Sequence, residues 1–282
     1  MPLIAGLAGV VATLYVLPLL LAVLTLRFKW RAKVPTVAAV AAAWLDKRWT
    51  DAARATLEQL TAQGFVLRTY LDGIAPKTSP TGTRCVALLA NESTGDMAQV
   101  AIVDRLNDRG EVEQITLPIF TFRAGSKRVA TSSSDTPGLF LRPRDHVAHA
   151  FPMLHNVATL YRAHRAICEG HVGTRRGELP APGSEVTQTT RDTAEAFAYQ
   201  ARRGMMRATR EGDYEATWRG AFRSVWKLHR RFVGGHKRRT HARGLRMLQE
   251  LGISPDPIVE LQVSNSPVGD DQLSPEMKTF MG

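Results

Sequence analysis

The chain of 282 residues has only two cysteines, Cys85 and Cys168, and it lacks the short motifs that mark common catalytic sites. It contains no phosphate-binding glycine loop, no GxSxG nucleophile elbow, no HExxH zinc motif and no CxxC pair. Two isolated thiols exclude a disulfide-rich framework and are compatible with a reducing compartment. The sequence therefore favours a protein that is not an enzyme, and we expect no cofactor.

Charged side chains are also missing from residues 2–26, and four basic residues then follow between Arg27 and Lys33. An apolar helix of this length spans about 37 Å, against a hydrocarbon core of about 30 Å. The sequence thus predicts a transmembrane anchor over residues 1–28. The position of the basic residues predicts a single-pass protein of the cell membrane, with its N-terminus outside and its C-terminal domain cytoplasmic. A cleavable signal peptide is the alternative, but its basic residues would precede the apolar segment.

Gly6 and Gly9 lie among alanines in the outer half of this segment. Small residues allow two membrane helices to approach closely, so a homo-oligomer is one interpretation. A monomeric span that faces lipid is the other.

The next part of the chain, residues 36–172, has the pattern of an α+β domain. Apolar residues at helical spacing predict a helix between Thr36 and Gln63. Short polar connections then separate runs of β-branched residues, which predicts an antiparallel meander of four to five strands packed by helices. The expected strands are Phe65–Leu71, Arg84–Ala90, Met97–Leu106, Val112–Phe122 and Arg128–Ser132.

Two segments of this domain depart from a regular meander. Pro118 cannot donate a hydrogen bond to a neighbouring strand, so the fourth strand is expected to be bulged or to lie at an edge. Residues 135–152 are expected to form a loop, and the apolar stripe that begins at Leu154 predicts a helix packed on the sheet. Residues 173–188 read as a linker, 189–251 as a basic α-helical C-terminal region, and 252–282 as a flexible tail.

The basic residues are concentrated in this C-terminal region. Between Tyr199 and Arg246 there are 14 Lys or Arg against three acids, a net charge of +11 that equals the charge of the whole chain. Four aromatic residues recur every fourth position from Tyr214 to Trp226, and a basic row follows one residue later. Such a helix suits an anionic lipid surface. We favour burial of the aromatic row in a bundle, because that is the commoner use of aromatic residues at helical spacing.

The residues expected to contact an anionic surface are Arg219, Arg223, Lys227, Arg230, Arg231, Lys237, Arg238 and Arg239. Nucleic acid is a less favoured partner, because no zinc finger, RNA-binding strand motif or helix-turn-helix is recognisable.

One constellation could hold a metal. His164, Cys168 and His171 occupy positions i, i+4 and i+7 of the helix that begins near Leu154, so their side chains share one face. The same positions continue an apolar stripe, which favours packing over metal binding.

The sequence as a whole predicts a non-catalytic interaction or scaffold module anchored in the lipid bilayer. Its basic helices would bind anionic lipid headgroups or a protein partner. A metal-assisted hydrolase and a membrane tether for nucleic acid are the alternatives.

Overall fold

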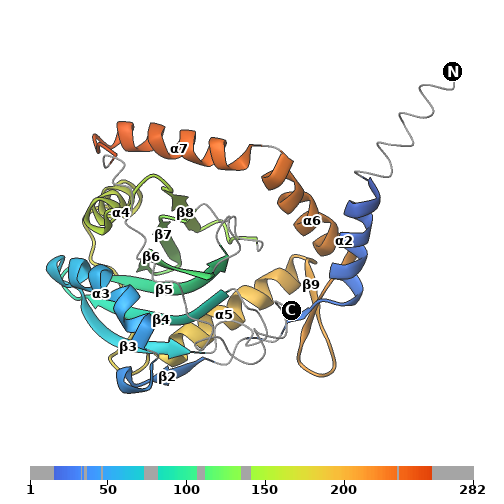
Figure 1. Cartoon of the computed structure of the whole chain (residues 1–282), viewed down its shortest axis with the longest axis horizontal. Coiled ribbons are helices and arrows are strands. Elements are labelled where there is room, and N and C mark those ends of the chain that lie inside the picture. Colours follow the sequence, from blue (N-terminus) through green and yellow to red (C-terminus); the bar gives the residue numbers. More distant parts are fainter. Residues whose placement is uncertain are drawn as a thin grey trace. The chain divides into compact units, whose positions relative to one another are not determined.

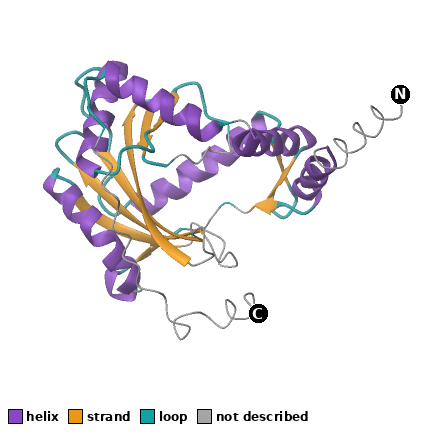
Figure 2. Cartoon of the chain, turned by 45° about the horizontal axis from the view of Figure 1, so that its top comes forward, coloured by secondary structure: helices purple, strands orange, loops and turns teal. Residues whose placement is uncertain are grey.

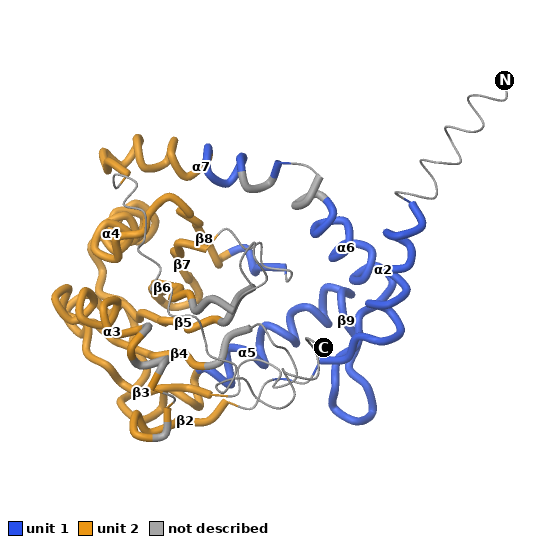
Figure 3. Tube along the Cα trace, viewed as in Figure 1, with its two compact units in different colours: residues 1–35, 135–144, 189–242 blue, residues 36–134, 145–188, 243–282 orange. Residues whose placement is uncertain are grey.

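The computed structural model describes residues 16–32, 34, 37–45, 47–72, 82–106, 112–134, 141–233 and 235–255. The chain divides into two compact units that are each assembled from separate stretches of sequence (Figure 3). Unit 1 comprises residues 1–35, 135–144 and 189–242, and unit 2 comprises residues 36–134, 145–188 and 243–282.

Unit 2 is built on a twisted sheet of seven strands in the order β2-β3-β4-β5-β6-β7-β8 (Figures 1 and 2). The strands are β2 (Ala38–Val40), β3 (Val66–Asp72), β4 (Gly82–Asn91), β5 (Asp96–Leu106), β6 (Val112–Ala124), β7 (Lys127–Ser132) and β8 (His146–Ala150). Neighbours are antiparallel except β7 and β8, which are parallel. The α+β class is as predicted, and β3 to β7 are the five expected strands. The predicted number of strands was too low, because β2 and β8 extend the sheet at its two edges.

Helices α3 (Lys47–Ala62) and α4 (Val157–Val172) pack on one face of this sheet. Alternate residues of β5, such as Ala98 and Val100, point into the core that these helices cover. Ala101 points to the opposite face, where it packs in a smaller apolar cluster. The first turn of α5 (Glu185–Arg202) covers part of that cluster through Val186. The sheet therefore has apolar packing on both faces.

Pro118 lies within β6, whose register against β5 has no shift. The prediction that this strand is bulged or lies at an edge is therefore wrong, because β6 lies between β5 and β7 in the sheet. The register shifts occur instead in the pairings of β3 with β4 and of β4 with β5. The pairing of β6 with β7 begins at Ile119, directly after Pro118. The proline thus lies in the part of β6 that β7 does not pair with, where no hydrogen bond to β7 is lost.

Two segments adopt structures that differ from the expected ones. The helix expected from Thr36 begins only at Lys47, because β2 pairs with β3 and a 3-10 turn over Ala42–Trp44 follows. Part of the expected loop 135–152 is the strand β8, which adds to β7 in parallel. Both strands are too short for a clear two-residue period, so pairing at a sheet edge determines their conformation.

Unit 1 contains a small sheet in the order β1-β10-β9. Its elements are α2 (Leu17–Phe28), β1 (Arg31–Ala32), β9 (Met206–Ala208), β10 (Tyr214–Ala216) and α6 (Trp218–Val233). Helix α2 packs against α6 through a core that contains Val23, Ala221 and Val225. The hairpin of β9 and β10 lies within residues 189–251, so this predicted region is not helical throughout. Helix α7 (His236–Glu250) follows α6, and its Leu248 is buried in the core of unit 2.

The predicted transmembrane anchor is wrong. Within the described ranges, no helix combines the length and the apolar content that a membrane crossing requires. Helix α2 has 12 residues, which is about 18 Å, and its Val23 is buried against α6 rather than facing lipid. Residues 1–15 of the predicted anchor lie outside the described part of the chain. The single-pass localisation, with its inside and outside assignment, was inferred from this helix and is withdrawn with it.

Gly95, in the turn between β4 and β5, permits a close backbone approach. It has a φ of +75°, and a Cβ atom there would lie 2.2 Å from the carbonyl oxygen of Gly177. Gly125 has a φ of +58° but no atom within 4 Å of a Cβ. Gly125→Ala should lower the free energy of unfolding by about 1–2 kcal/mol through the left-handed backbone alone. Gly95→Ala should cost about 1–3 kcal/mol more, because it adds a steric clash. If chemical denaturation showed the same loss of unfolding free energy for Gly95→Ala and Gly125→Ala, this would contradict the close approach of Gly95 to Gly177.

Candidate functional site

The first candidate site is a group of polar side chains buried between α4 and the sheet. Asp96 is the first residue of β5, and its side chain is 0% exposed. The preceding turn is held by Asn91, whose Oδ1 accepts hydrogen bonds from the backbone of Ser93 and Thr94. Asn91 also donates to the carbonyl oxygen of Gln63, just beyond α3. The turn therefore fixes Asp96 relative to its strand and to the end of α3.

Three side chains of α4 meet the Asp96 carboxylate. The Tyr161 hydroxyl donates to Asp96 Oδ2 at 2.8 Å, and Arg165 Nη1 donates to the two carboxylate oxygens at 3.2 and 3.3 Å. His164 Nε2 lies 3.5 Å from Asp96 Oδ1. These residues reach one carboxylate because neighbouring turns of the helix present them to the same face.

His164 connects this carboxylate with two further groups. Its Nδ1 lies 3.0 Å from the Thr131 hydroxyl of β7, and its Nε2 lies 3.5 Å from Cys168 Sγ. Thr131, His164 and Cys168 are all 0% exposed. Asp96, His164 and Cys168 therefore form a cluster whose ligand atoms all lie within 4.8 Å of one another.

The electrostatics of the cluster follow from its burial. Burial alone would raise the pKa of Asp96, but the hydrogen bond and charge of His164, with hydrogen bonds from Thr94 and Tyr161, lower it. Burial, and next the charge of Asp96, raises the pKa of the Cys168 thiol to about 12. A thiol in this state is neutral at physiological pH and is a poor nucleophile. The cluster therefore does not have the character of a cysteine-based catalytic site.

The structure brings together only part of the predicted metal-binding set. His164 and Cys168 meet, but His171 is exposed and its ring stacks near that of His149, at 6.1 Å between centroids. Asp96 takes the place expected for His171. Asp96 lies one residue before the expected strand Met97–Leu106 and was not predicted as a site residue, although the two-residue period of β5 places it on the same face as Ala98 and Val100.

The second candidate site is an exposed aromatic row on α6. Trp218, Phe222 and Trp226 are 53%, 61% and 49% exposed. The favoured interpretation, in which these aromatic residues are buried in a bundle, is therefore wrong. The small residues Ala221 and Val225 make the buried face of α6 instead. Tyr214, the first member of the expected row, lies on β10 and is only partly exposed.

Helix α2 extends this apolar surface. Phe28 is 66% exposed, and its ring meets that of Trp218 edge to face, with 5.5 Å between centroids. The Arg27 guanidinium lies over both rings. Helix α2 also leaves Leu17, Leu20 and Leu21 exposed. We call the exposed apolar side chains of α2 and α6, together with Arg219, Arg223 and Lys227, the α2–α6 face.

The predicted basic row lies beside the aromatic one. Arg219 and Arg223 are exposed and Lys227 is half-buried. Burial, and next the positive charges of Arg142 and Arg223, lowers the pKa of Lys227. Arg142, Arg223 and Lys227 therefore lie close enough together for their charges to affect one another.

The remaining predicted basic residues follow on α6 and α7. The side chains of Arg230, Arg231 and Lys237 lie outside what the structure describes, whereas Arg238 and Arg239 are exposed on α7.

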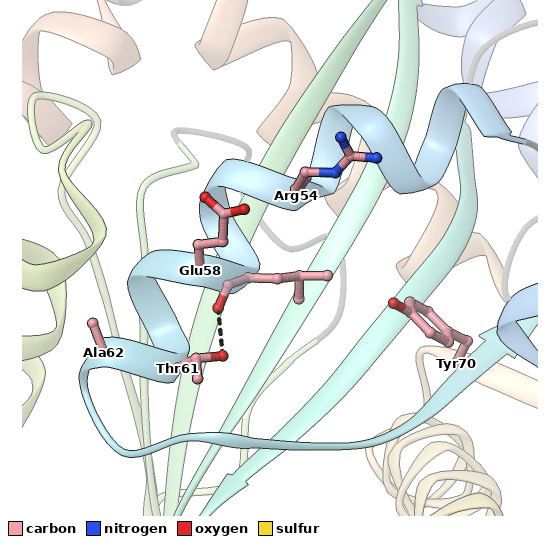
Figure 4. A pocket seen from close by; sticks show the side chains of 6 residues that line it. Arg54, Glu58, Thr61, Ala62 and Tyr70 are labelled. Atoms are coloured by element: carbon pink, nitrogen blue, oxygen red, sulfur yellow. Dashed lines mark hydrogen bonds between the residues drawn. The ribbon is translucent and has the colours of Figure 1, made fainter.

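An open depression of about 610 Å³ lies beside α3 (Figure 4). It is lined by Arg54, Leu57, Glu58, Thr61, Ala62 and Tyr70. In Figure 4, Arg54 and Glu58 extend from α3 while Tyr70 stands apart on β3. Arg54 is paired with Asp51 at 2.6 Å, and the Thr61 hydroxyl donates to the Leu57 carbonyl. The lining groups do not converge on a common point, so we assign no chemistry to this depression.

Comparison with protein families, with curated proteins and with solved structures finds no match to this chain.

The contribution of the Tyr161–Asp96 hydrogen bond to the stability of the fold can be measured with a Tyr161 variant. Tyr161→Phe should lower the free energy of unfolding by about 1–3 kcal/mol, because it removes a hydrogen-bond donor from a buried charge. Tyr199→Phe is the matched control, since the Tyr199 hydroxyl makes an exposed hydrogen bond to the Arg142 carbonyl at 3.4 Å. The control should change stability by less than about 0.5 kcal/mol in urea denaturation. Similar effects for the two variants would show that the Asp96 contact is not stabilising.

Proposed function

We propose that this protein is a non-catalytic module that docks on anionic lipid surfaces through its α2–α6 face. Docking is peripheral and needs no spanning helix. The observation that supports it most is the exposure of Trp218, Phe222 and Trp226 beside a basic row. Aromatic and leucine side chains can enter the boundary between headgroups and acyl chains, while arginine and lysine contact phosphate.

The mixture of side chains favours lipid over other anionic partners. Nucleic acid could stack on the aromatic rings. However, the exposed leucines of α2, such as Leu17 and Leu21, offer nothing to a polar backbone or to bases. An acidic protein could pair with Arg219 and Arg223, but it would also have to bury several large apolar side chains. Only a lipid surface offers an anionic layer and an apolar layer side by side.

The metal-assisted hydrolase has less support. Within the described part of the chain, the three residues that could hold a metal, Asp96, His164 and Cys168, are fully buried. A catalytic metal needs a position that substrate can reach.

The apolar part of the α2–α6 face can be tested by vesicle flotation of the full chain. Phe222→Ser combined with Trp226→Ser should reduce binding to vesicles rich in anionic phospholipid at least about tenfold, because it removes two insertable rings. Val66→Ser is the control, since Val66 is 59% exposed on β3 of unit 2 and is not part of the α2–α6 face. It should leave binding unchanged. Binding by the double variant at the wild-type level would contradict the proposal.

The charged part of the face is tested on the same vesicles. Each of Arg219→Gln and Arg223→Gln should weaken binding about fivefold, since one charge near an anionic surface contributes about 1 kcal/mol. Arg162→Gln, an exposed arginine on α4, serves as the control. Wild-type binding should also fall with added salt and be weak on neutral vesicles. Equal binding to neutral and anionic vesicles would refute the electrostatic component, and no binding to either would point to a protein partner.

A further inference from the structure

The small sheet of unit 1 gathers three arginines around one carboxylate. Its register pairs Arg31 of β1 and Arg207 of β9 with Glu215 of the central strand β10. Side chains directly opposite one another on antiparallel strands lie on the same face of the sheet. Arg207 forms an ion pair with one oxygen of the Glu215 carboxylate, and Arg27 Nη1 of α2 lies 3.9 Å from the other. Guanidinium groups from three elements therefore lie on one side of the sheet.

The charges of this cluster do not balance within the described part of the chain. Glu215 is shared by Arg27 and Arg207, and Arg31 pairs with Glu211 at 3.1 Å. Three cations thus face two carboxylates. The separation of 3.9 Å between Arg27 and Glu215 is too long for a hydrogen bond, and Arg27 Nε is buried with no hydrogen-bond partner among the described residues. Arg27 is therefore the least compensated of the three cations, and a bound anion would supply the missing negative charge.

The cluster combines one fixed arginine with two that a ligand can reach. The side chain of Arg27 is only 13% exposed, and its guanidinium lies over the rings of Phe28 and Trp218, at 5.4 and 6.0 Å from their centroids. The side chains of Arg31 and Arg207 are 58% and 61% exposed. An exposed ion pair such as that of Arg31 with Glu211 contributes little to stability, so an incoming anion can replace Glu211 at small cost.

We propose that Arg27, Arg31 and Arg207 bind a phosphate monoester. Guanidinium groups donate paired N–H groups to phosphate oxygens. A monoester presents three such oxygens and a charge close to −2, whereas a diester has only two unesterified oxygens. Once the ligand has replaced Glu211, the three arginines and Glu215 carry two net positive charges, which equal the charge of the monoester dianion.

Two sources could supply this phosphate. Phe28 and Trp218, which contact Arg27, belong to the α2–α6 face, so a lipid whose headgroup is a phosphate monoester would place its phosphate beside the inserted rings. This lipid source rests on the proposed docking function. A soluble phosphate monoester is the other source of the same chemistry, and it needs no membrane.

The site is tested first with glycerol 3-phosphate, a soluble monoester, by titration calorimetry of the purified full chain. We expect saturable binding of one ligand per chain. Arg207→Gln removes an exposed guanidinium and should weaken this binding at least about tenfold. Arg27→Lys should weaken it similarly, because an ammonium keeps the charge but lacks the planar fork. Arg162→Gln on α4 of unit 2 is the control and should bind as the wild type does, and circular dichroism should show that each variant is folded.

The source of the phosphate is tested on vesicles that contain either phosphatidic acid, a monoester, or phosphatidylserine, a diester, at matched surface charge. If lipid is the source, wild-type binding should be at least about threefold stronger on phosphatidic acid. Arg207→Gln should remove this preference, whereas Arg219→Gln should weaken binding to both vesicles equally.

The outcomes separate this proposal from the docking proposal. Binding of glycerol 3-phosphate that is lost in Arg207→Gln supports the site even if neither vesicle is bound, and it then assigns a soluble ligand. A preference for phosphatidic acid that survives in Arg207→Gln would overturn the proposal. So would a wild type that neither binds glycerol 3-phosphate nor prefers phosphatidic acid, even if it docks on anionic vesicles.

Discussion

The burial of the Asp96 carboxylate is the constraint on which unit 2 depends. An ionised group that is fully removed from water needs partners, and breaking a buried pair typically costs about 3–5 kcal/mol. Tyr161, His164 and Arg165 supply these partners from one face of α4. The position of α4 on the sheet is therefore set by a charge as well as by apolar packing. Asn91, in the turn between β4 and β5 that precedes Asp96, also donates a hydrogen bond to the residue after α3. The β4–β5 hairpin therefore contacts both α3 and α4.

Helix α6 illustrates how one helix can separate three kinds of contact. Ala221 and Val225 are small and allow α2 to pack closely. The larger Phe222 and Trp226 lie beside that contact and stay exposed. The basic row comes next around the helix, and Arg223 lies close enough to affect the pKa of Lys227. Burying the small side chains and exposing the large ones is the reverse of ordinary core packing, and our docking proposal is based on this exposure.

Prediction from the sequence was correct where a hydrophobic period continued over a whole helix or strand. The five strands from β3 to β7 and the helix α4 follow from alternation, hairpin signals and the apolar stripe. Prediction failed where contacts between residues far apart in the sequence determine the structure. The uncharged run before Arg27 suggested lipid, whereas Val23 packs against α6. The packing of α2 also explains why the aromatic row is exposed, because α2 covers the face of α6 that carries Ala221 and Val225. Asp96 was missed because sequence spacing cannot show that the first residue of a strand contacts a helix residue 65 positions later in the chain.

Hydrogen–deuterium exchange of the full chain, with and without anionic vesicles, tests the central claim most directly. If the α2–α6 face docks on the lipid surface, backbone amides of α2 and α6 should exchange more slowly in the presence of anionic vesicles. The amides of α4 and the seven-stranded sheet should be unchanged, because that unit is ordered by its own core. Unchanged exchange in α2 and α6, or protection confined to the sheet, would contradict the account.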